Sequence, residues 1–360
     1  MGFRILSLIA ICGELPYDQL PRLPGGDSYK AKVIQSLKRQ KLLRSFHRDG
    51  LWTYRLTQAA KMLLKEKYPL RFADDLSGAA AANHLKTEPE KRLRLQRITE
   101  ATVTIQNAGV RVYRDEKPRL FSADWEKSVP AFTVPVFYNS REFKEMGRFF
   151  TKSYGARSVG VLLTARNIFT VYNLGNTLIQ WAYKAEMRTK GVLQTILCND
   201  RLFHLYTRES LQGLLLANTM ELAFDILSNT HRDQHFILDG NYAHFHYLTN
   251  DRRGELLLTL LCSPELCTRL EDILLNDLYE GDENSILEND AFDEAGDPVL
   301  LGHTCDLPRI MRFNTALLRQ GKSGTLICFD FQREVLQRYC GNCVRFQTID
   351  FQKWERSFFV

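Results

Sequence analysis

One stretch of the sequence, residues 28–67, restricts the fold more than any other, because a helix, two short strands and a second helix follow one another in it. Ser28 comes directly after Asp27, and both residue types are favoured as helix N-caps. Apolar side chains then recur at helical spacing, at Val33, Ile34 and Leu37. This pattern predicts a helix that buries one face and leaves the opposite face in solvent.

The second half of the stretch predicts a β-hairpin followed by a helix. Runs rich in aromatic and apolar residues, 41–47 and 51–56, flank the tripeptide Arg48-Asp49-Gly50. An Asp-Gly pair between two such runs is the strongest short-range signal for a hairpin, because both residues tolerate a positive φ. Thr57 is a favoured N-cap type and begins a predicted helix over 58–67.

The exposed residues of the first helix and the hairpin form a candidate DNA-binding surface. A basic helix with a polar face suits the major groove, and a hairpin tipped by His47 and Arg48 suits a neighbouring groove or the phosphates. The predicted DNA-binding residues are Ser28, Tyr29, Lys30, Lys32, Gln35, Arg39, Arg44, His47, Arg48 and Trp52.

Positive charge is concentrated at the N-terminus. Residues 1–72 hold 14 Lys and Arg but 5 Asp and Glu, a surplus of nine positive charges. The whole chain has a net charge of +6, so the other 288 residues carry −3. A basic N-terminal part followed by a slightly acidic remainder indicates that residues 1–72 are the part that binds a polyanion, here DNA.

The order helix, helix, helix, wing, helix resembles the winged-helix superfamily. Within it, the N-terminal 70 residues or so resemble the replication-relaxation family, accessory proteins of plasmids and conjugative elements. The resemblance rests on Leu-Lys-Arg-Gln-Lys-Leu-Leu (37–43), on the wing, on Thr-Tyr-Arg-Leu-Thr (53–57) and on domain order. The rest of the chain resembles uncharacterised proteins of bacterial mobile elements. The resemblance implies a non-catalytic DNA-binding protein and supplies no catalytic residues. Some winged helices instead bind proteins, and that alternative stays open.

The predicted domains are a winged-helix head (1–72), a linker with a connecting or dimerising helix (73–115), and a body (116–360). The predicted fold class is α/β, or α+β over the whole chain. Further elements expected in the head and connector are helices at 3–12, 16–23 and 85–107.

The body is predicted to end in a βαβαβ unit, because its middle strand is apolar almost throughout. That unit comprises strands at 298–304, 325–331 and 344–351 and helices at 306–320 and 332–339. Upstream we expect a strand at 132–137, hairpins at 159–172 and 234–248, and helices at 141–151, 176–197, 211–227 and 254–278. The acidic stretch 280–297 is interpreted as a solvated loop.

The sequence favours no metal or catalytic site and no cofactor. The less favoured metal alternative combines Cys340 and Cys343, a lone Cys-x-x-Cys, with His303 and Cys305. Two rival functions remain: a transcriptional regulator that senses a small ligand near Asp330, and a metal-dependent nuclease with an unrecognised carboxylate site.

The eight cysteines lie mostly in apolar runs, which is typical of reduced thiols in the cytoplasm. No apolar stretch reaches the roughly 18–20 residues that span a bilayer. The expected partners are therefore double-stranded DNA for the head, and a second copy of the chain or the replication and transfer machinery for the body, with no membrane.

Overall fold

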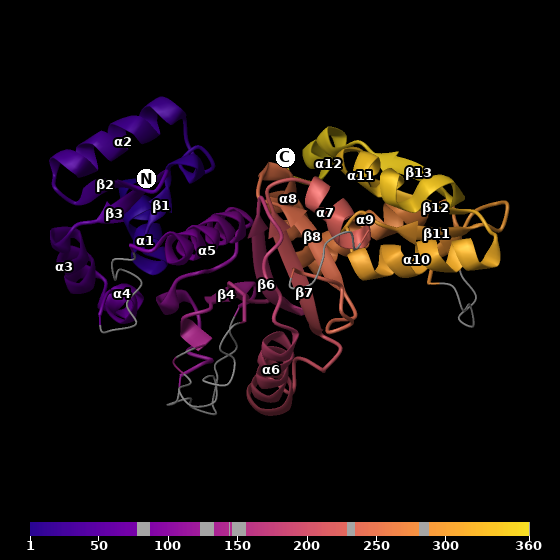
Figure 1. The fold of residues 1–360 in the computed structure, drawn as a ribbon, viewed down its shortest axis with the longest axis horizontal. Helices are drawn as coiled ribbons and strands as arrows, with labels where there is room; N and C mark the ends of the chain where they lie inside the picture. The colour runs from indigo at the N-terminus through magenta and orange to yellow at the C-terminus, as the bar shows by residue number, and fades with distance from the viewer. Residues whose placement is uncertain are drawn as a thin grey trace. The chain divides into compact units, whose positions relative to one another are not determined.

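The structure is a computed structural model that describes residues 1–77, 87–122, 133–143, 145, 156–228, 235–280 and 288–359. Within these ranges the chain forms 12 α-helices and three β-sheets, so it mixes α and β structure (Figure 1). Internal contacts divide the chain into two compact units. The first is Met1–Arg148 with Val159–Val161, and the second is Phe149–Ser158 with Leu162–Val360.

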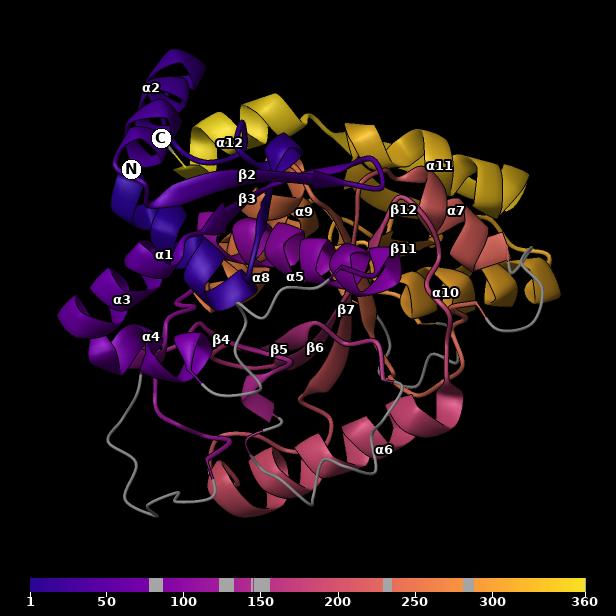
Figure 2. The same cartoon turned by 60° about the vertical axis from the view of Figure 1, so that its left-hand side comes forward.

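The first unit is a set of helices around a small antiparallel sheet of order β1-β3-β2. Its elements are α1 (Gly2–Cys12), β1 (Leu15–Pro16), the 3-10 helix η1 (Tyr17–Gln19), α2 (Asp27–Arg39), β2 (Leu43–Arg48), β3 (Leu51–Leu56), α3 (Gln58–Lys67), α4 (Pro69–Leu76), α5 (Pro89–Asn107), the 3-10 helix η2 (Arg114–Glu116) and β4 (Val136–Asn139). The helices α3 and α4 lie side by side, as Figure 2 shows.

The hairpin predicted from Asp-Gly is confirmed. Arg48 pairs with Leu51, and between them Asp49 has φ 52° and Gly50 φ 74°. Two successive positive φ values match the right-handed twist of the flanking strands, which explains why this dipeptide occupies the turn. The helix after the hairpin is confirmed at 58–67, and its N-cap Thr57 accepts a hydrogen bond from the Ala60 amide at 3.2 Å.

The helix predicted at 16–23 is wrong. Leu15 and Pro16 instead pair with Tyr54 and Thr53 as strand β1, and a single 3-10 turn follows. The fixed φ of Pro16 suits the first turn of a helix, but it also suits an edge strand, where no amide donor is needed.

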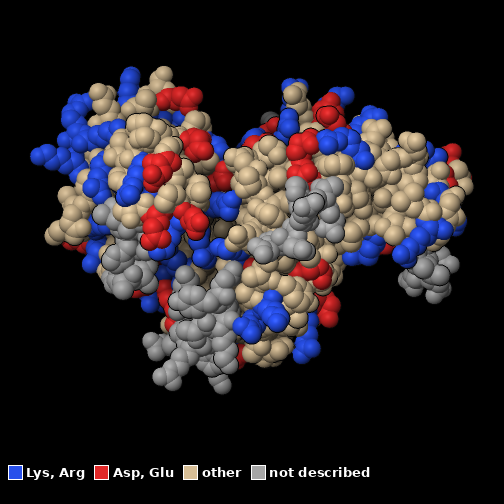
Figure 3. Space-filling view, viewed as in Figure 1, with Lys and Arg blue, Asp and Glu red and all other residues tan. Residues whose placement is uncertain are grey.

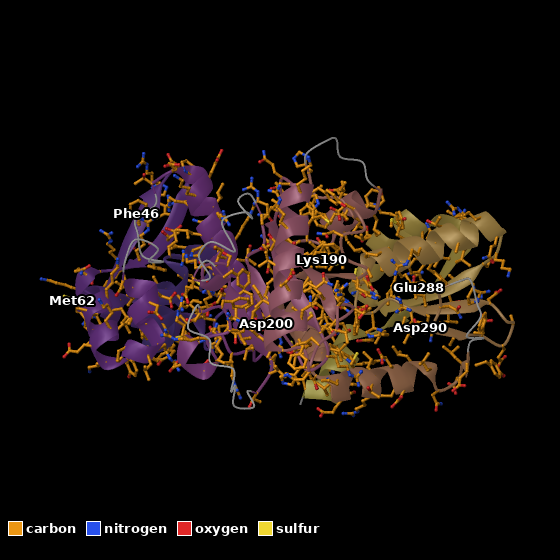
Figure 4. All side chains as sticks on the ribbon, turned by 90° about the horizontal axis from the view of Figure 1, so that it is seen from below. Phe46, Met62, Lys190, Asp200, Glu288 and Asp290 are labelled. Atoms are coloured by element: carbon orange, nitrogen blue, oxygen red, sulfur yellow. The ribbon has the colours of Figure 1, made fainter. Side chains whose placement is uncertain are left out.

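A buried charge network fastens α5 to the hairpin. The Glu14 carboxylate, fully buried, pairs with Arg55 of β3 at 2.6 Å and with Arg92 of α5 at 3.8 Å. Arg92 also donates to the carbonyl oxygens of Arg48 (2.7 Å) and Leu51 (3.0 Å), the two residues that flank the turn. The Phe46 ring, labelled in Figure 4, lies 3.8 Å from the Arg55 guanidinium and 4.8 Å from that of Arg92. The expected helix over 85–107 therefore packs inside the first unit.

The second unit contains two sheets whose central strands are parallel. In the first, β6 (Ile168–Gly175) pairs with β7 (Leu211–Ala217), and β7 with β8 (Phe245–Thr249). The second has the order β13-β12-β11-β10-β9, in which β11 (Pro298–Leu301), β12 (Gly324–Phe329) and β13 (Val344–Ile349) are parallel. The short β9 (Tyr279–Glu280) and β10 (Ala291–Phe292) complete it antiparallel.

Helices connect these strands. They are α6 (Tyr183–Leu193), the π-helical segment η5 (Gln194–Arg201), α7 (Glu221–Ser228), α8 (Arg252–Cys262), α9 (Pro264–Leu275), α10 (Leu307–Gln320), α11 (Asp330–Cys340), the 3-10 turn η6 (Gly341–Cys343) and α12 (Phe351–Phe359). Strand β5 (Gly160–Leu163) precedes β6, as expected. The predicted βαβαβ unit is confirmed as β11-α10-β12-α11-β13 (Figure 1).

Two further predictions for the second unit are wrong. Residues 211–227 form strand β7 and the short α7, because an apolar run buried on both faces does not reveal its periodicity. Among its described residues the hairpin at 234–248 does not form, since β8 pairs in parallel with β7 and Gly240 makes only a bend. Strand β4 includes the last two residues of the strand predicted at 132–137. Most of the helix predicted at 141–151 lies outside the described residues.

The acidic stretch 280–297 is paired with arginines in its described part. Glu288 and Asp290, both labelled in Figure 4, bind Arg309 at 3.0 and 2.9 Å. Asp293 and Asp297 bind Arg345 at 2.8 and 2.7 Å. The interpretation as a solvated loop is therefore wrong for these residues, because their partners come from α10 and β13.

One carboxyl group of the second unit, that of Glu186, is buried beside strand β6. Glu186 of α6 is fully buried and accepts hydrogen bonds from the Arg157 amide (2.6 Å) and the Tyr172 hydroxyl (3.0 Å). Burial raises the pKa of Glu186 from 4.5 to about 7, against the opposing effect of these hydrogen bonds.

We expect the substitution Arg92→Met to destabilise the first unit by about 3–5 kcal/mol, because it leaves part of the buried Glu14 charge and two turn carbonyls without their partner. Lys91→Met is the matched control, since Lys91 is exposed and forms an ion pair with the exposed Glu88. Chemical denaturation measures the loss, and hydrogen exchange across 43–56 shows whether the hairpin opens first. Equal stability of the two variants would contradict the role of Arg92.

Glu186 also predicts a pH dependence of stability. Between about pH 4.5 and 7 the folded protein retains a proton on Glu186 that the unfolded chain releases. The contribution of Glu186 is therefore full at low pH and is lost as pH rises through the folded pKa, by about 3 kcal/mol in total. Glu186→Gln should remove this slope. The measurement is the free energy of unfolding of both proteins across the window, and parallel curves would refute the assignment.

Candidate nucleic-acid interface

The exposed face of α2 carries five of the six predicted helix residues. Ser28, Tyr29, Lys32, Gln35 and Arg39 are exposed, with Tyr29 at 55%. The apolar residues Ile34 and Leu37 turn to the interior, as the spacing predicted. Lys and Arg side chains project from the end of the unit where α2 leads into β2, shown in blue in Figure 3.

Lys30 does not belong to this surface. Its side chain is buried, and its Nζ donates to the carbonyl oxygens of Pro21 (2.7 Å) and Leu23 (3.1 Å) while pairing with Asp27 at 2.8 Å. Side chains in a helix tilt toward its N-terminus, so a cation in the first turn reaches back over the preceding loop. Lys30 thus ties that loop to α2, and the prediction of DNA contact is wrong for it.

The hairpin presents all four of its predicted residues to solvent. Arg44, His47, Arg48 and Trp52 are exposed. His47 and Trp52 are a cross-strand pair whose rings stack at 3.8 Å, and the Tyr17 ring lies 5.8 Å from Trp52. These contacts hold flat rings at the exposed surface of the hairpin.

Sequence reasoning missed three cations in the same unit. Lys38 and Lys41 are exposed at the end of α2. Burial, together with the positive charge of Arg44, lowers the pKa of Lys61, which places Lys61 of α3 close to Arg44 of β2. The surplus of basic residues in 1–72 signalled such cations, but only the packing of α3 brings Lys61 to Arg44.

The alternative metal set does not assemble. Cys343 donates through Sγ to the Asn314 side chain of α10 (3.2 Å) and to the Cys340 carbonyl (3.3 Å). Within the described ranges, only one group of three or more potential metal ligands exists, and it joins His303 to residues of α9 in place of Cys305, Cys340 or Cys343. All eight cysteines are free thiols.

In the described part of the chain, no helix has the length and apolar character needed to cross a membrane. Comparisons with protein-family models, with curated proteins and with solved structures found no match in any of the three. The surface formed by α2 and the β2-β3 hairpin is therefore interpreted from its own geometry and charge.

Proposed function

We propose that residues 1–72 form a winged-helix head that binds double-stranded DNA, with α2 in the major groove and the β2-β3 hairpin as the wing. The observation that carries the proposal is an exposed basic face of α2 that is followed directly by the β2-β3 hairpin. The turn of this hairpin is held by hydrogen bonds from Arg92 to the carbonyl oxygens on either side of it. A helix enters the major groove, and an anchored hairpin can contact the adjacent backbone without first becoming ordered.

The order of elements supports this assignment. Helix α1, strand β1, helix α2 and the β2-β3 hairpin follow one another, and β1 joins the hairpin as the third strand. The departure from the expected pattern lies between β1 and α2, where one 3-10 turn replaces the second helix. The loop that this leaves is fastened by Lys30, so α2 still begins at a fixed position.

The chemistry of the surface suits phosphates and bases together. Lys32, Arg39 and Arg44 supply charges for phosphates, while Ser28 and Gln35 supply polar groups that can contact base edges. The stacked pair His47–Trp52 offers an exposed aromatic surface on the hairpin. Most of these groups are cationic, so the affinity will depend steeply on salt.

For the whole chain we propose a non-catalytic, cytoplasmic accessory protein of a bacterial mobile element, whose body binds a second copy of itself or the replication and transfer machinery. Among the residues that the structure describes, there is no group of three carboxylates placed to hold a metal, the arrangement that the nuclease alternative needs. Asp330, proposed for ligand sensing, is exposed at the start of α11.

We expect the double substitution Lys32→Glu and Arg48→Glu to weaken binding to mixed-sequence duplex DNA by well over about tenfold at moderate salt, because phosphate contacts dominate affinity. The slope of log K against log salt should fall by about 2, one for each lost phosphate contact. Fluorescence anisotropy of labelled duplex at two salt concentrations measures both quantities.

The matched control is Arg319→Glu with Lys322→Glu, two exposed cations of the second unit, which makes the same change in net charge. It should bind DNA as the unmodified protein does. Equal losses in both double variants would mean a general charge effect. No binding by the unmodified protein would assign the head to protein contacts, and nicking of supercoiled plasmid with Mg²⁺ would reveal an enzyme.

A further inference from the structure

His303 is a buried histidine whose ring makes no hydrogen bond within the described residues. His303 follows strand β11 and is 2% exposed. Among the described residues, neither ring nitrogen, Nδ1 or Nε2, has a hydrogen-bond partner. Buried polar groups are nearly always satisfied, so an orphaned ring of this kind calls for a ligand. Its backbone is fixed, since the Gln332 side chain donates to the His303 carbonyl at 3.0 Å.

Two further donor atoms face this ring from helix α9. Cys267 and Glu271 are four residues apart, so they lie on one face of the helix, and the Cys267 Sγ is 3.3 Å from the Glu271 Oε1. The ligand atoms of Cys267, Glu271 and His303 all lie within 4.8 Å of one another. Sulfur, carboxylate oxygen and imidazole nitrogen thus converge from α9 and from the end of β11.

We infer that Cys267, Glu271 and His303 form a binding site for a divalent transition metal ion, with Zn²⁺ as the ion that this donor set suits best. Thiolate, imidazole and carboxylate are the three ligand types of protein zinc sites, and a zinc ion accepts them in tetrahedral geometry. The inference concerns the second unit alone and does not depend on DNA binding by the head.

The sulfur–oxygen separation and the charge of the donor set fit this ion. With ligand bonds near 2.0–2.3 Å, the edge of a zinc tetrahedron is about 3.5 Å, close to the observed separation of sulfur and oxygen. One thiolate and one carboxylate together cancel the two charges of the ion, once the Cys267 thiol has released its proton to solvent. Arg309, whose charge acts on His303, is itself paired with Glu288 and Asp290.

The fourth position faces solvent, because Cys267 and Glu271 are only partly buried whereas His303 is buried. A water molecule can complete the coordination there. Bound in this way, the ion joins α9 to the end of β11, the first strand of the βαβαβ unit. This arrangement makes the ion a clamp on the C-terminal sheet.

Cobalt(II) titration tests the site. Full-length protein freed of metal with a chelator should bind one equivalent of Co²⁺ and develop thiolate-to-cobalt absorption in the near ultraviolet. Cys267→Ser should abolish that absorption, and Glu271→Gln should weaken binding by more than about tenfold, the loss seen even for outer-shell partners. Cys343→Ser is the matched control, a half-buried cysteine outside the site, and should retain the absorption. No absorption in the unmodified protein, or absorption that persists in Cys267→Ser, would overturn the inference.

A second variant separates metal binding from folding. His303→Leu removes a buried ring without a hydrogen-bond partner among the described residues, so the metal-free variant should melt at or above the temperature of the metal-free unmodified protein. Zn²⁺ should raise the melting temperature of the unmodified protein and not that of the variant. An equal rise in both proteins, or a large loss of stability in metal-free His303→Leu, would show that His303 has another role.

Discussion

The first unit depends on a single buried carboxylate shared between two guanidinium groups. Glu14 follows α1, Arg55 lies on β3 and Arg92 comes from α5, so three segments far apart in sequence meet at one charge. A buried charge is costly unless it is paired and hydrogen-bonded, which makes this meeting point a strong constraint on how the segments assemble. The aromatic ring of Phe46 lies close to both guanidinium groups and adds cation–π contacts to the network.

Local signals in the sequence were sufficient where neighbours in the chain decide the structure. Asp49-Gly50 predicted a turn with two positive φ values, and Thr57 predicted the start of α3, because both depend on residues within a few positions. The βαβαβ unit was predictable from the apolar middle strand at 324–329 and the amphipathic helices around it. The same reasoning failed at 211–217, where the burial of both faces removes the periodicity that separates a strand from a helix.

The candidate sites required contacts that no spacing reveals. Lys30 has the residue type and the position of a DNA-binding residue, and only the path of the loop before α2 shows that its ammonium group is buried. Arg92 lies in a stretch dense with charge that resembles any solvated helix, although its side chain is fully buried. His303 was grouped with Cys340 and Cys343 because they share the C-terminal region, whereas the donors beside it come from α9, more than thirty residues upstream.

The attachment of the hairpin also bears on how such a surface can diversify. Arg92 binds the carbonyl oxygens of residues 48 and 51, and every amino acid supplies a carbonyl oxygen. The support therefore does not depend on which side chains stand at these two positions. Substitutions at the tip can alter what the hairpin contacts while the scaffold beneath it stays the same, so recognition and foldability can evolve separately in this part of the chain.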